Sequence, residues 1–291
     1  MPLKEKFKSG KFVALGEFEP PKGSDLSPLL NNANLVRGRV DAIVVPEMAN
    51  AVMKASSLGG GAFLQLNGFE PIIQMCCRDR NRLALQADIL AAAGLGIKNV
   101  MAVSGDEIAY GDHHQARPVN DLDLIQLLEA VRGLCQGKDM AGIELKGVPD
   151  FFIGSSFNTG ATGGALGVEI DELNKKIDTG IEFIVTTPVF DLHRFEQVLK
   201  RIEEKKIAII PNVILLKSAG MARYIDRNIK HISIPAETII SVQKAPDKVQ
   251  QCIKICGETV SQLKSMGVAG VMISTMGWED KLSAVLDQAK L

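Results

Sequence analysis

The chain has 291 residues and carries 33 Lys and Arg against 34 Asp and Glu, so its formal net charge is −1. A net charge this close to zero provides no overall electrostatic attraction to a nucleic acid or to an anionic membrane, and we expect neither partner. With 46% hydrophobic and 23% charged residues, the composition is that of a folded globular protein rather than a disordered one. Only four histidines are present, so we expect no metal site.

The cysteines indicate the redox compartment that we expect for the protein, and the apolar runs indicate whether the chain could span a membrane. Five cysteines form a sparse, odd-numbered set, which favours a reducing cytoplasm over a disulfide framework. We expect Cys252 and Cys256, four residues apart on a predicted helix, to pack in the core. The vicinal Cys76 and Cys77 are interpreted in the same way, with a redox role second. The longest apolar run, 207–216, is too short for a membrane span of roughly 18 residues.

Eight short runs of β-branched and other apolar residues follow one another along the chain. Their hydrophobicity is nearly continuous, which is typical of strands covered on both faces, as in a parallel sheet surrounded by helices. The predicted strands are 11–17, 41–46, 71–76, 99–104, 151–156, 182–187, 206–213 and 269–275.

Helical patterns separate these strands. The predicted helices are one capped by Asp79 and ending at Gly94, then 122–133, 173–177, 195–202, 221–229 and a long segment over 236–266. Eight alternations of strand and helix predict a (β/α)₈ TIM barrel, with residues 1–291 as a single barrel domain. The runner-up is an open doubly wound sheet, which favours a glycine-rich fingerprint after the first strand. The first strand instead runs into Glu17-Phe18-Glu19-Pro20-Pro21.

Two glycine-rich stretches fall between the predicted elements and are interpreted as loops. They are Gly59-Gly60-Gly61 and Gly160–Gly167. The second lacks the lysine of a phosphate-binding P-loop, so a mobile active-site loop is the better interpretation.

Chemistry in such a barrel belongs at the carboxyl ends of the strands. The polar residues expected there are Glu17, Glu19, Glu47, Gln74, Asp106, Asn158, Thr187, Lys217 and Thr275. Any one of them could equally be a loop cap. Glu17 stands out because it lies within an apolar run, and a partly buried carboxyl has a raised pKa. The residues predict acid–base work by a carboxylate, or binding of a polar heterocycle.

Several motifs resemble the methylenetetrahydrofolate reductase family. In chain order they are Glu17-Phe18-Glu19-Pro20-Pro21, Arg78–Gln86 (RDRNRLALQ), Val103-Ser104-Gly105-Asp106, Gly111-Asp112-His113, Asp121-Leu122-Asp123, Lys176–Gly180 (KIDTG) and Phe190-Asp191. Together they cover nearly the whole chain, and Cys77 to Asp106 is the most specific part. This version resembles the forms found in anaerobic bacteria, including acetogens.

The resemblance implies a flavin-containing barrel that reduces 5,10-methylenetetrahydrofolate to 5-methyltetrahydrofolate. In that family hydride passes from flavin N5 to the methylene carbon, after the imidazolidine ring has opened to a 5-iminium cation. Glu17 matches the glutamate that protonates N10. Asp106 matches the aspartate between pterin and flavin, whose negative charge stabilises the cation.

The resemblance also implies binding positions. Those for the flavin are Gln74, Ser104, Gly105, Asp123, Asn158, Lys176 and Asp178, and those for the substrate are Asp106, Thr187 and Met221. For Lys176 the chemical reason is direct, because an ammonium group offers a cation to a phosphate.

Departures from the NADH-dependent relatives leave the cofactor and the electron donor open. Ser104 and Asn120 replace an arginine and a tyrosine at the adenine end, so both FAD and FMN are candidates. No aromatic residue stands near 219–221, where relatives stack one on nicotinamide or folate. Electrons therefore come either from NAD(P)H or from an iron–sulfur partner subunit, since the chain has no cluster motif of its own. We expect an oligomer or a hetero-complex.

Two other functions stay open at this point. The first is a non-catalytic folate-binding or scaffold paralogue within a larger complex. Pro46, Asn120 and Thr187 stand where NADH-dependent relatives have a threonine, a tyrosine and a pterin-binding glutamine, and these substitutions favour it. The retained Glu17 and Asp106 count against it. The second is a barrel methyltransferase that uses the same folate without a flavin.

Overall fold

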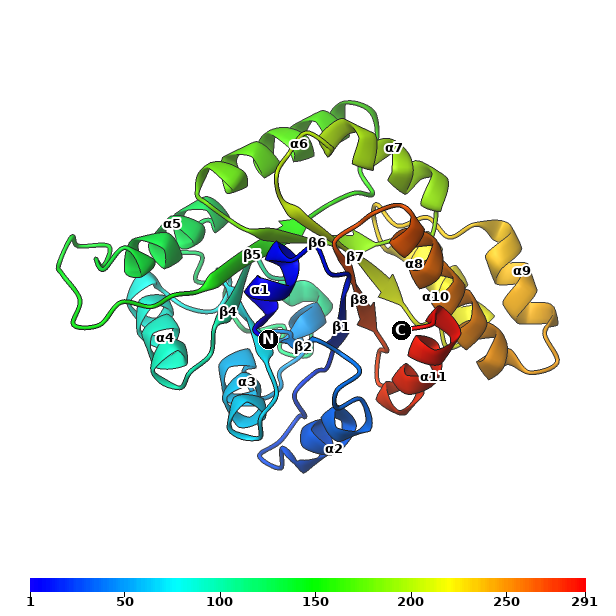
Figure 1. Ribbon diagram of the computed structural model, residues 1–291, viewed down its shortest axis with the longest axis horizontal. Coiled ribbons are helices and arrows are strands. Elements are labelled where there is room, and N and C mark those ends of the chain that lie inside the picture. Colours follow the sequence, from blue (N-terminus) through cyan, green and yellow to red (C-terminus); the bar gives the residue numbers. More distant parts are fainter.

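Eight parallel strands form the centre of the computed structural model, which describes residues 1–291 (Figure 1). Each strand pairs with the next one along the chain, and the last pairs with the first, which closes a (β/α)₈ barrel. The strands are β1 (Val13–Glu17), β2 (Ala42–Val45), β3 (Pro71–Cys76), β4 (Asn99–Val103), β5 (Phe152–Phe157), β6 (Phe183–Pro188), β7 (Ala208–Ile214) and β8 (Gly270–Ser274). All eight predicted strands are confirmed, each to within two residues at either end.

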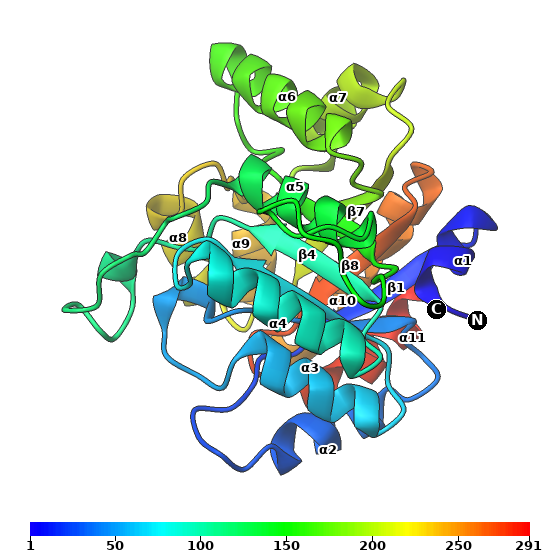
Figure 2. The same ribbon diagram turned by 90° about the vertical axis from the view of Figure 1, so that its left-hand side faces the viewer.

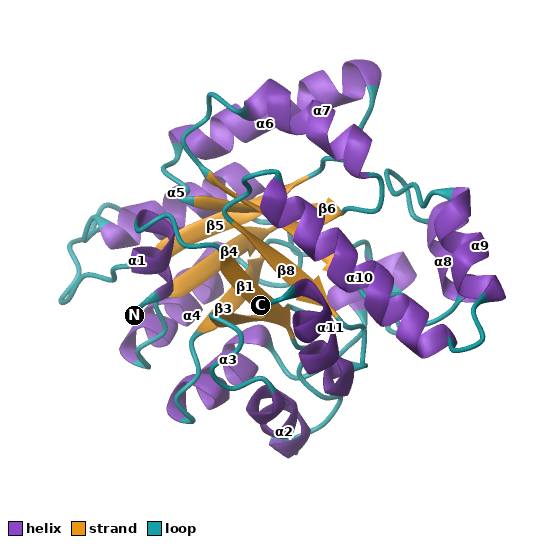
Figure 3. Ribbon diagram, turned by 45° about the vertical axis from the view of Figure 1, so that its right-hand side comes forward, coloured by secondary structure: helices purple, strands orange, loops and turns teal.

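Helices surround this barrel and connect successive strands (Figure 3). They are α1 (Leu3–Lys8), α2 (Ser27–Leu35), α3 (Ser57–Leu66), α4 (Arg82–Gly94), α5 (Leu124–Cys135), α6 (Gly163–Asp178), α7 (Leu192–Ile202), α8 (Ala219–Asn228), α9 (Ala236–Lys244), α10 (Lys248–Ser265) and α11 (Leu282–Ala289), with single 3₁₀ turns η1 (Ala49–Ala51), η2 (Ile108–Tyr110) and η3 (Glu279–Lys281). None of the helices combines the length and the apolar character that crossing a membrane requires.

Side-chain alternation divides each strand between an inner and an outer core. Twelve buried residues form the inner cluster, among them Leu15 and Met272, and the rings of Phe152 and Phe183 stack there with centroids 4.8 Å apart. Two larger clusters of 30 and 25 buried residues pack the outer faces of the strands against the helices. A residue's place in the alternation therefore tells whether it faces the barrel interior.

Helix α1 closes the end of the barrel at which the strands begin. Leu3 is completely buried in the inner cluster, and its N–H donates to Glu70 Oε1 at 2.8 Å. The ring of Phe7 packs against that of Phe152 with centroids 5.4 Å apart. Figure 2 shows α1 and both termini at this end. The opposite end, where the strands finish and their loops begin, is called the mouth below.

The cysteines pack in the core as expected. Cys252 and Cys256 of α10 are buried in the outer cluster, and burial raises the pKa of Cys256 to about 12. Burial likewise raises the pKa of Cys76 to about 12. Both thiols therefore stay protonated, and the cysteine side chains behave as small apolar groups.

Two predictions around α3 and α4 are wrong. Asn81, not Asp79, caps α4, because the Asn81 side chain accepts the Ala84 N–H at 3.0 Å whereas Asp79 pairs with Arg78. The glycines at 59–61 lie inside α3 rather than in a loop. A Cβ on Gly61 would come within 2.3 Å of Ile73, so glycine lets this helix lie directly on β3.

Two further predictions fail in the second half of the chain. Residues 163–167 form the first turns of α6 rather than a mobile loop. The long helix over 236–266 is two helices, because α9 ends before Pro246, which cannot continue it. Asp247 then starts α10 by accepting the Gln250 N–H at 3.0 Å.

Candidate active site

A layer of polar side chains lines the barrel interior just below the mouth. Strand register places Glu17 beside Ser274, and Asn212 beside Met272. Since Leu15 and Met272 belong to the inner cluster, alternation directs Glu17, Asn212 and Ser274 inward. By the same rule the inward polar residues are Glu17 on β1, Gln74 on β3, Ser156 on β5, Asn212 on β7 and Ser274 on β8. A polar layer on an apolar barrel is a binding surface for a ligand that enters through the mouth.

Glu17 is the acidic group of this layer. It ends a strand whose other four residues are fully buried, and the Glu17 side chain has no ion-pair partner. Burial raises the pKa of its carboxyl from 4.5 to about 7. A substantial share of the Glu17 side chains therefore carries a proton at neutral pH, as a general acid requires.

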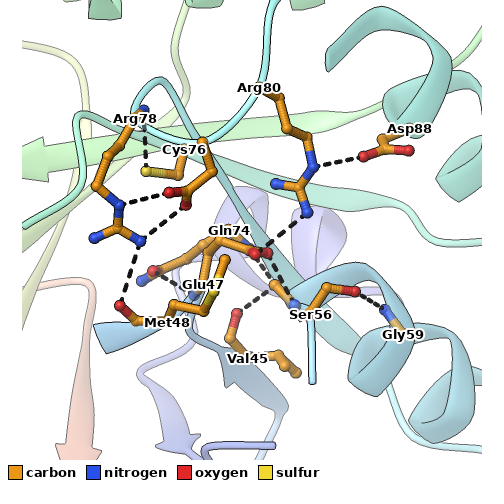
Figure 4. Close-up of polar contacts among 12 residues, drawn as sticks. Val45, Glu47, Met48, Ser56, Gly59, Gln74, Cys76, Arg78, Arg80 and Asp88 are labelled. Atoms are coloured by element: carbon orange, nitrogen blue, oxygen red, sulfur yellow. Dashed lines mark hydrogen bonds and ion pairs between the residues drawn. The ribbon is translucent and has the colours of Figure 1, made fainter. Parts of the chain in front are cut away.

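A hydrogen-bonded network fixes Gln74 on the β2–β3 side of the mouth (Figure 4). The backbone N–H of Gln74 donates to Ser57 Oγ at 2.8 Å, and its Oε1 accepts the Glu47 N–H at 3.2 Å. Gln74 is the only residue of β3 that is not fully buried. Because Glu47 holds the oxygen, the side-chain nitrogen is the end left for a ligand.

Glu47 anchors this network from below the surface. Its Oε2 accepts the Ser57 N–H at 2.9 Å, and its Oε1 lies 3.3 Å from Arg80 Nη2. Arg80 is in turn bonded to Asp88, with Nε and Oδ2 2.8 Å apart (Figure 4). Burial raises the pKa of Glu47, and the nearby Arg80 opposes that rise. The buried Glu47 carboxylate therefore lies just below the mouth and connects the start of α3 with Arg80 in the segment after β3.

The turn after β4 brings exposed backbone to the mouth. Gly105 has φ +90°, and a Cβ there would come within 2.3 Å of Cys76 Sγ. Arg78 secures the same turn, since its Nη1 donates to the Asp106 carbonyl at 2.9 Å. Its other donors form a bidentate pair with Asp79 at 2.7 and 2.8 Å. Ser104 and Gly105 are therefore held in place and open to solvent.

Asp106 is at the mouth and is bonded to a neighbouring loop. Its Oδ2 accepts the Asn50 N–H at 2.7 Å. Three residues of that loop, Met48, Asn50 and Ala51, have left-handed φ values of 46°, 55° and 55°. Such conformations are costly for residues other than glycine and persist where neighbouring contacts fix them. The Asp106 carboxylate is one of those contacts.

The loop between β4 and α5 also reaches across the mouth. Asp112 accepts the Met53 N–H at 3.0 Å and pairs with Lys22, and these contacts hold the pKa of its carboxyl well below its usual range. Gly111 lies against the Ala51 carbonyl so closely that no Cβ fits between them. Figure 2 shows this loop extending beyond the barrel at the end away from the termini.

The polar groups after β5 and β6 are bonded to each other. Thr187 Oγ1 accepts the Thr159 N–H at 3.1 Å and lies 3.2 Å from Thr159 Oγ1. Asn158 donates to Glu169 at 3.0 Å and accepts the Gly160 N–H at 3.0 Å. Both Thr187 and Asn158 are thus at the mouth, but their main hydrogen-bonding groups have protein partners.

The remaining predicted binding residues do not form one group. Asp123 caps α5 in a capping box with Gln126. Met221 lies in the first turn of α8, where its N–H is bonded to Ser218. Lys176 is almost fully buried, its Nζ donates to the Ser156 carbonyl at 2.8 Å, and burial lowers its pKa. Asp178 is exposed at the far end of α6, on the turn that leads into the start of β6. The structure therefore does not bring Asp178 to the mouth.

Two residues at the mouth escaped the sequence prediction. Asn212 is the only polar residue of β7 and follows a proline, which resembles a loop signal more than an inward-facing strand position. Trp278 follows β8, and its ring lies 5.6 Å from Lys217 Nζ. It supplies an aromatic side chain near the strand ends although none stands at 219–221. By contrast, Thr275 is fully buried directly after the end of β8.

Comparison with known proteins gives both a family and structural neighbours. The family model of methylenetetrahydrofolate reductase matches residues 3–290. A solved structure described as an uncharacterized protein from Clostridium thermocellum that binds two copies of 5-methyl-5,6,7,8-tetrahydrofolic acid is similar, with a TM-score of 0.70 and 14% identity. That likeness covers 99% of this chain and 98% of the other. A 2,3-dimethylmalate lyase of the PEP mutase/isocitrate lyase superfamily shares the fold at a TM-score of 0.56 and 9% identity, over 99% of this chain and 87% of the other.

Proposed function

The chain belongs to the methylenetetrahydrofolate reductase family, and we propose that it reduces 5,10-methylenetetrahydrofolate to 5-methyltetrahydrofolate with a bound flavin. The observation that carries this proposal is the partly buried Glu17, an inward-facing carboxyl whose pKa of about 7 suits proton transfer at neutral pH. The neighbour from Clostridium thermocellum, described as binding methyltetrahydrofolate, supports a folate as the ligand.

The mouth fits the ring of a flavin better than its phosphate. Gln74 offers a fixed side-chain N–H donor, and Ser104 and Gly105 offer exposed backbone, which suits a ring with amide-like edges. Lys176 is nearly buried and uses one of its three donors on the Ser156 carbonyl, which leaves it little open to a phosphate. The proposed flavin ligands are therefore Gln74, Ser104, Gly105, Asn158, Asp123 and Lys176, for either FAD or FMN, and Asp178 is left out. When bound, the flavin supplies hydride to the folate.

The protein's own residues handle the proton and the charge. Glu17 donates its proton to N10 as the imidazolidine ring opens, and burial keeps that proton available near neutral pH. The Asp106 carboxylate, whose Oδ2 also accepts the Asn50 N–H, stabilises the cationic substrate. The barrel walls exclude water from the reacting atoms.

Electrons reach the flavin either from NAD(P)H or from an iron–sulfur partner subunit in the cytoplasm. All five cysteines are free, and those at 76, 77, 252 and 256 are buried, which leaves no set for a cluster in this chain. We therefore place any such cluster in a partner chain, within a hetero-complex.

A visible spectrum of the purified protein, with mass analysis of the released cofactor, tests the proposal. We expect bound or reconstitutable FAD or FMN, and formation of methyltetrahydrofolate when reduced viologen is supplied with methylenetetrahydrofolate. Turnover with viologen but not with NADH or NADPH supports the partner-fed version, and rapid NADH oxidation excludes it. Failure to bind either flavin contradicts the proposed function.

The contact between Asp106 and Asn50 favours one second candidate, a folate-binding paralogue without redox activity. In that case the Asp106 carboxylate serves only to hold the loop at 48–51. Such a protein binds methyltetrahydrofolate in the absence of flavin and does not reduce methylenetetrahydrofolate with any electron donor.

A further inference from the structure

Asn212 carries a buried hydrogen-bond acceptor that no protein group satisfies. Its Oδ1 is closed off from solvent and has no donor within reach. The side chain faces the barrel interior in the polar layer, because Asn212 is in register with inward-facing Met272. Buried acceptors in folded proteins nearly always have a partner, so an unsatisfied one needs an explanation.

The fold itself does not need a carboxamide at this position. The backbone of Asn212 is already bonded, since its carbonyl accepts the Val189 N–H at 2.9 Å and its N–H points to Thr186 Oγ1 at 3.4 Å. Every other residue of β7 is apolar, and an apolar side chain would complete the strand without an unpaired group. The carboxamide therefore costs stability in the ligand-free protein.

The polar side chains that follow β5 and end β6, next to Asn212, already have protein partners. Thr187 of the adjacent strand is bonded to Thr159, and Asn158 is bonded to Glu169 and Gly160. Across the barrel, the side-chain oxygen of Gln74 accepts the Glu47 N–H, so its side-chain nitrogen is left for a ligand. The interior thus offers a fixed donor on β3 and an unpaired carboxamide oxygen on β7.

We propose that Asn212 is a specificity-determining residue that recognises a bound heterocycle through adjacent N–H and C=O groups. A carboxamide pairs with such an edge through two hydrogen bonds, and rotation about its last bond satisfies the orphaned Oδ1 at the same time. Pterin and isoalloxazine rings both carry this edge. The inference rests on the proposed function and adds to it a residue that the motifs did not assign.

Asn212→Leu tests this directly, because it removes the unpaired group and the recognition together. We expect the ligand-free variant to melt at the same temperature as the wild type or higher. Its affinity should be about tenfold lower, or ~1.4 kcal/mol, for one of two ligands titrated separately: methyltetrahydrofolate on flavin-free protein, or FAD and FMN without folate. The ligand whose affinity falls, the folate or the flavin, carries the ring that Asn212 recognises. Asn212→Asp, which keeps the shape of the side chain but loses its N–H donor, should lower the affinity for the same ligand.

Thr275→Val is the matched control. Like Asn212→Leu it removes a buried polar atom without a partner, here a hydroxyl, but from a completely buried residue beyond the end of β8. We expect unchanged affinity for both ligands. If Asn212→Leu and Asn212→Asp bind both ligands within twofold of the wild type, the inference is wrong while the proposed function stands. If the wild type binds neither folate nor flavin, both are wrong.

Discussion

At the scale of single residues, the proposed chemistry depends on a carboxyl whose pKa is raised by burial. The pKa of Glu17 is about 7 because burial disfavours the charged form, and no cation compensates. In the unfolded chain the same carboxyl has its ordinary pKa of 4.5. Between pH 4.5 and 7 the folded state therefore binds more protons than the unfolded state. As a result, the contribution of Glu17 to the free energy of unfolding falls as the pH rises from about 4.5 to 7.

Replacing Glu17 by Gln separates its chemical role from its structural one. We expect Glu17→Gln to lower the rate of folate reduction by about 10²- to 10⁴-fold, the usual worth of a general acid. Flavin binding and flavin reduction should be unchanged, which spectra and the rate of flavin bleaching measure. Folate turnover at the wild-type rate would contradict the assigned role.

The same variant carries a stability signature. Because Gln does not ionise, the melting temperature of Glu17→Gln relative to the wild type should be higher at pH 8 than at pH 5. Calorimetry at the two pH values measures this difference. A difference that does not change with pH means that Glu17 is not held neutral by burial.

The residues of the site differ in how far sequence reveals them. Glu17 was predictable because a lone acid in an apolar strand is unusual, and the structure shows its raised pKa. Asn212 was not predictable, because its importance depends on an inward-facing side chain with a buried, unpaired oxygen, which only the fold reveals. Lys176 was predicted as an open cation, but only the fold reveals that its ammonium is buried against Ser156.

At the scale of elements, close packing of a helix on a strand explains one failure of the sequence prediction. Glycine runs normally indicate loops, yet those in α3 permit contact between helix and strand. Gly60 is similarly tight, because a Cβ there would lie 2.9 Å from Pro20 and 3.1 Å from Val45. Helix α3 in turn supplies Ser57, which bonds the backbone of Gln74. The glycines therefore help to position the site.

Substituting Gly61 tests this packing. A Cβ on Gly61 would lie 2.3 Å from Ile73, so Gly61→Ala should destabilise the protein by about 1–3 kcal/mol through overpacking. The helical Gly94 has open space around its Cβ position, and Gly94→Ala should be neutral or stabilising by up to ~1 kcal/mol. Chemical denaturation measures both. Equal effects of the two variants would show that α3 does not lie tightly on β3.

At the scale of the whole molecule, the two ends of the barrel have different tasks. One end is closed by α1 and filled with aromatic and aliphatic side chains, and the other carries the polar layer and the long loops. The alternation of eight strands and helices was legible in the sequence because period and length are local properties. The cross-links between loops, such as Asp106 with Asn50, depend on closure of the barrel and have no local signal.

Truncating the side chain that plugs the closed end should affect stability alone. Leu3 is completely buried, so Leu3→Ala should cost about 2–5 kcal/mol of unfolding free energy. Leu66 is 76% exposed, and Leu66→Ala should change stability by less than about 0.5 kcal/mol. Folate affinity of the folded Leu3→Ala protein should match the wild type. A large loss of affinity would show that the two ends are coupled.

We propose that this barrel passes hydride from a flavin to a folate. The most direct measurement loads the protein with flavin, reduces it anaerobically, and mixes it with methylenetetrahydrofolate while the flavin absorbance is followed. We expect reoxidation of the flavin with one methyltetrahydrofolate formed per flavin, and a much slower reaction in Glu17→Gln. A flavin that stays reduced in the wild-type protein, with the folate bound but unchanged, would contradict it.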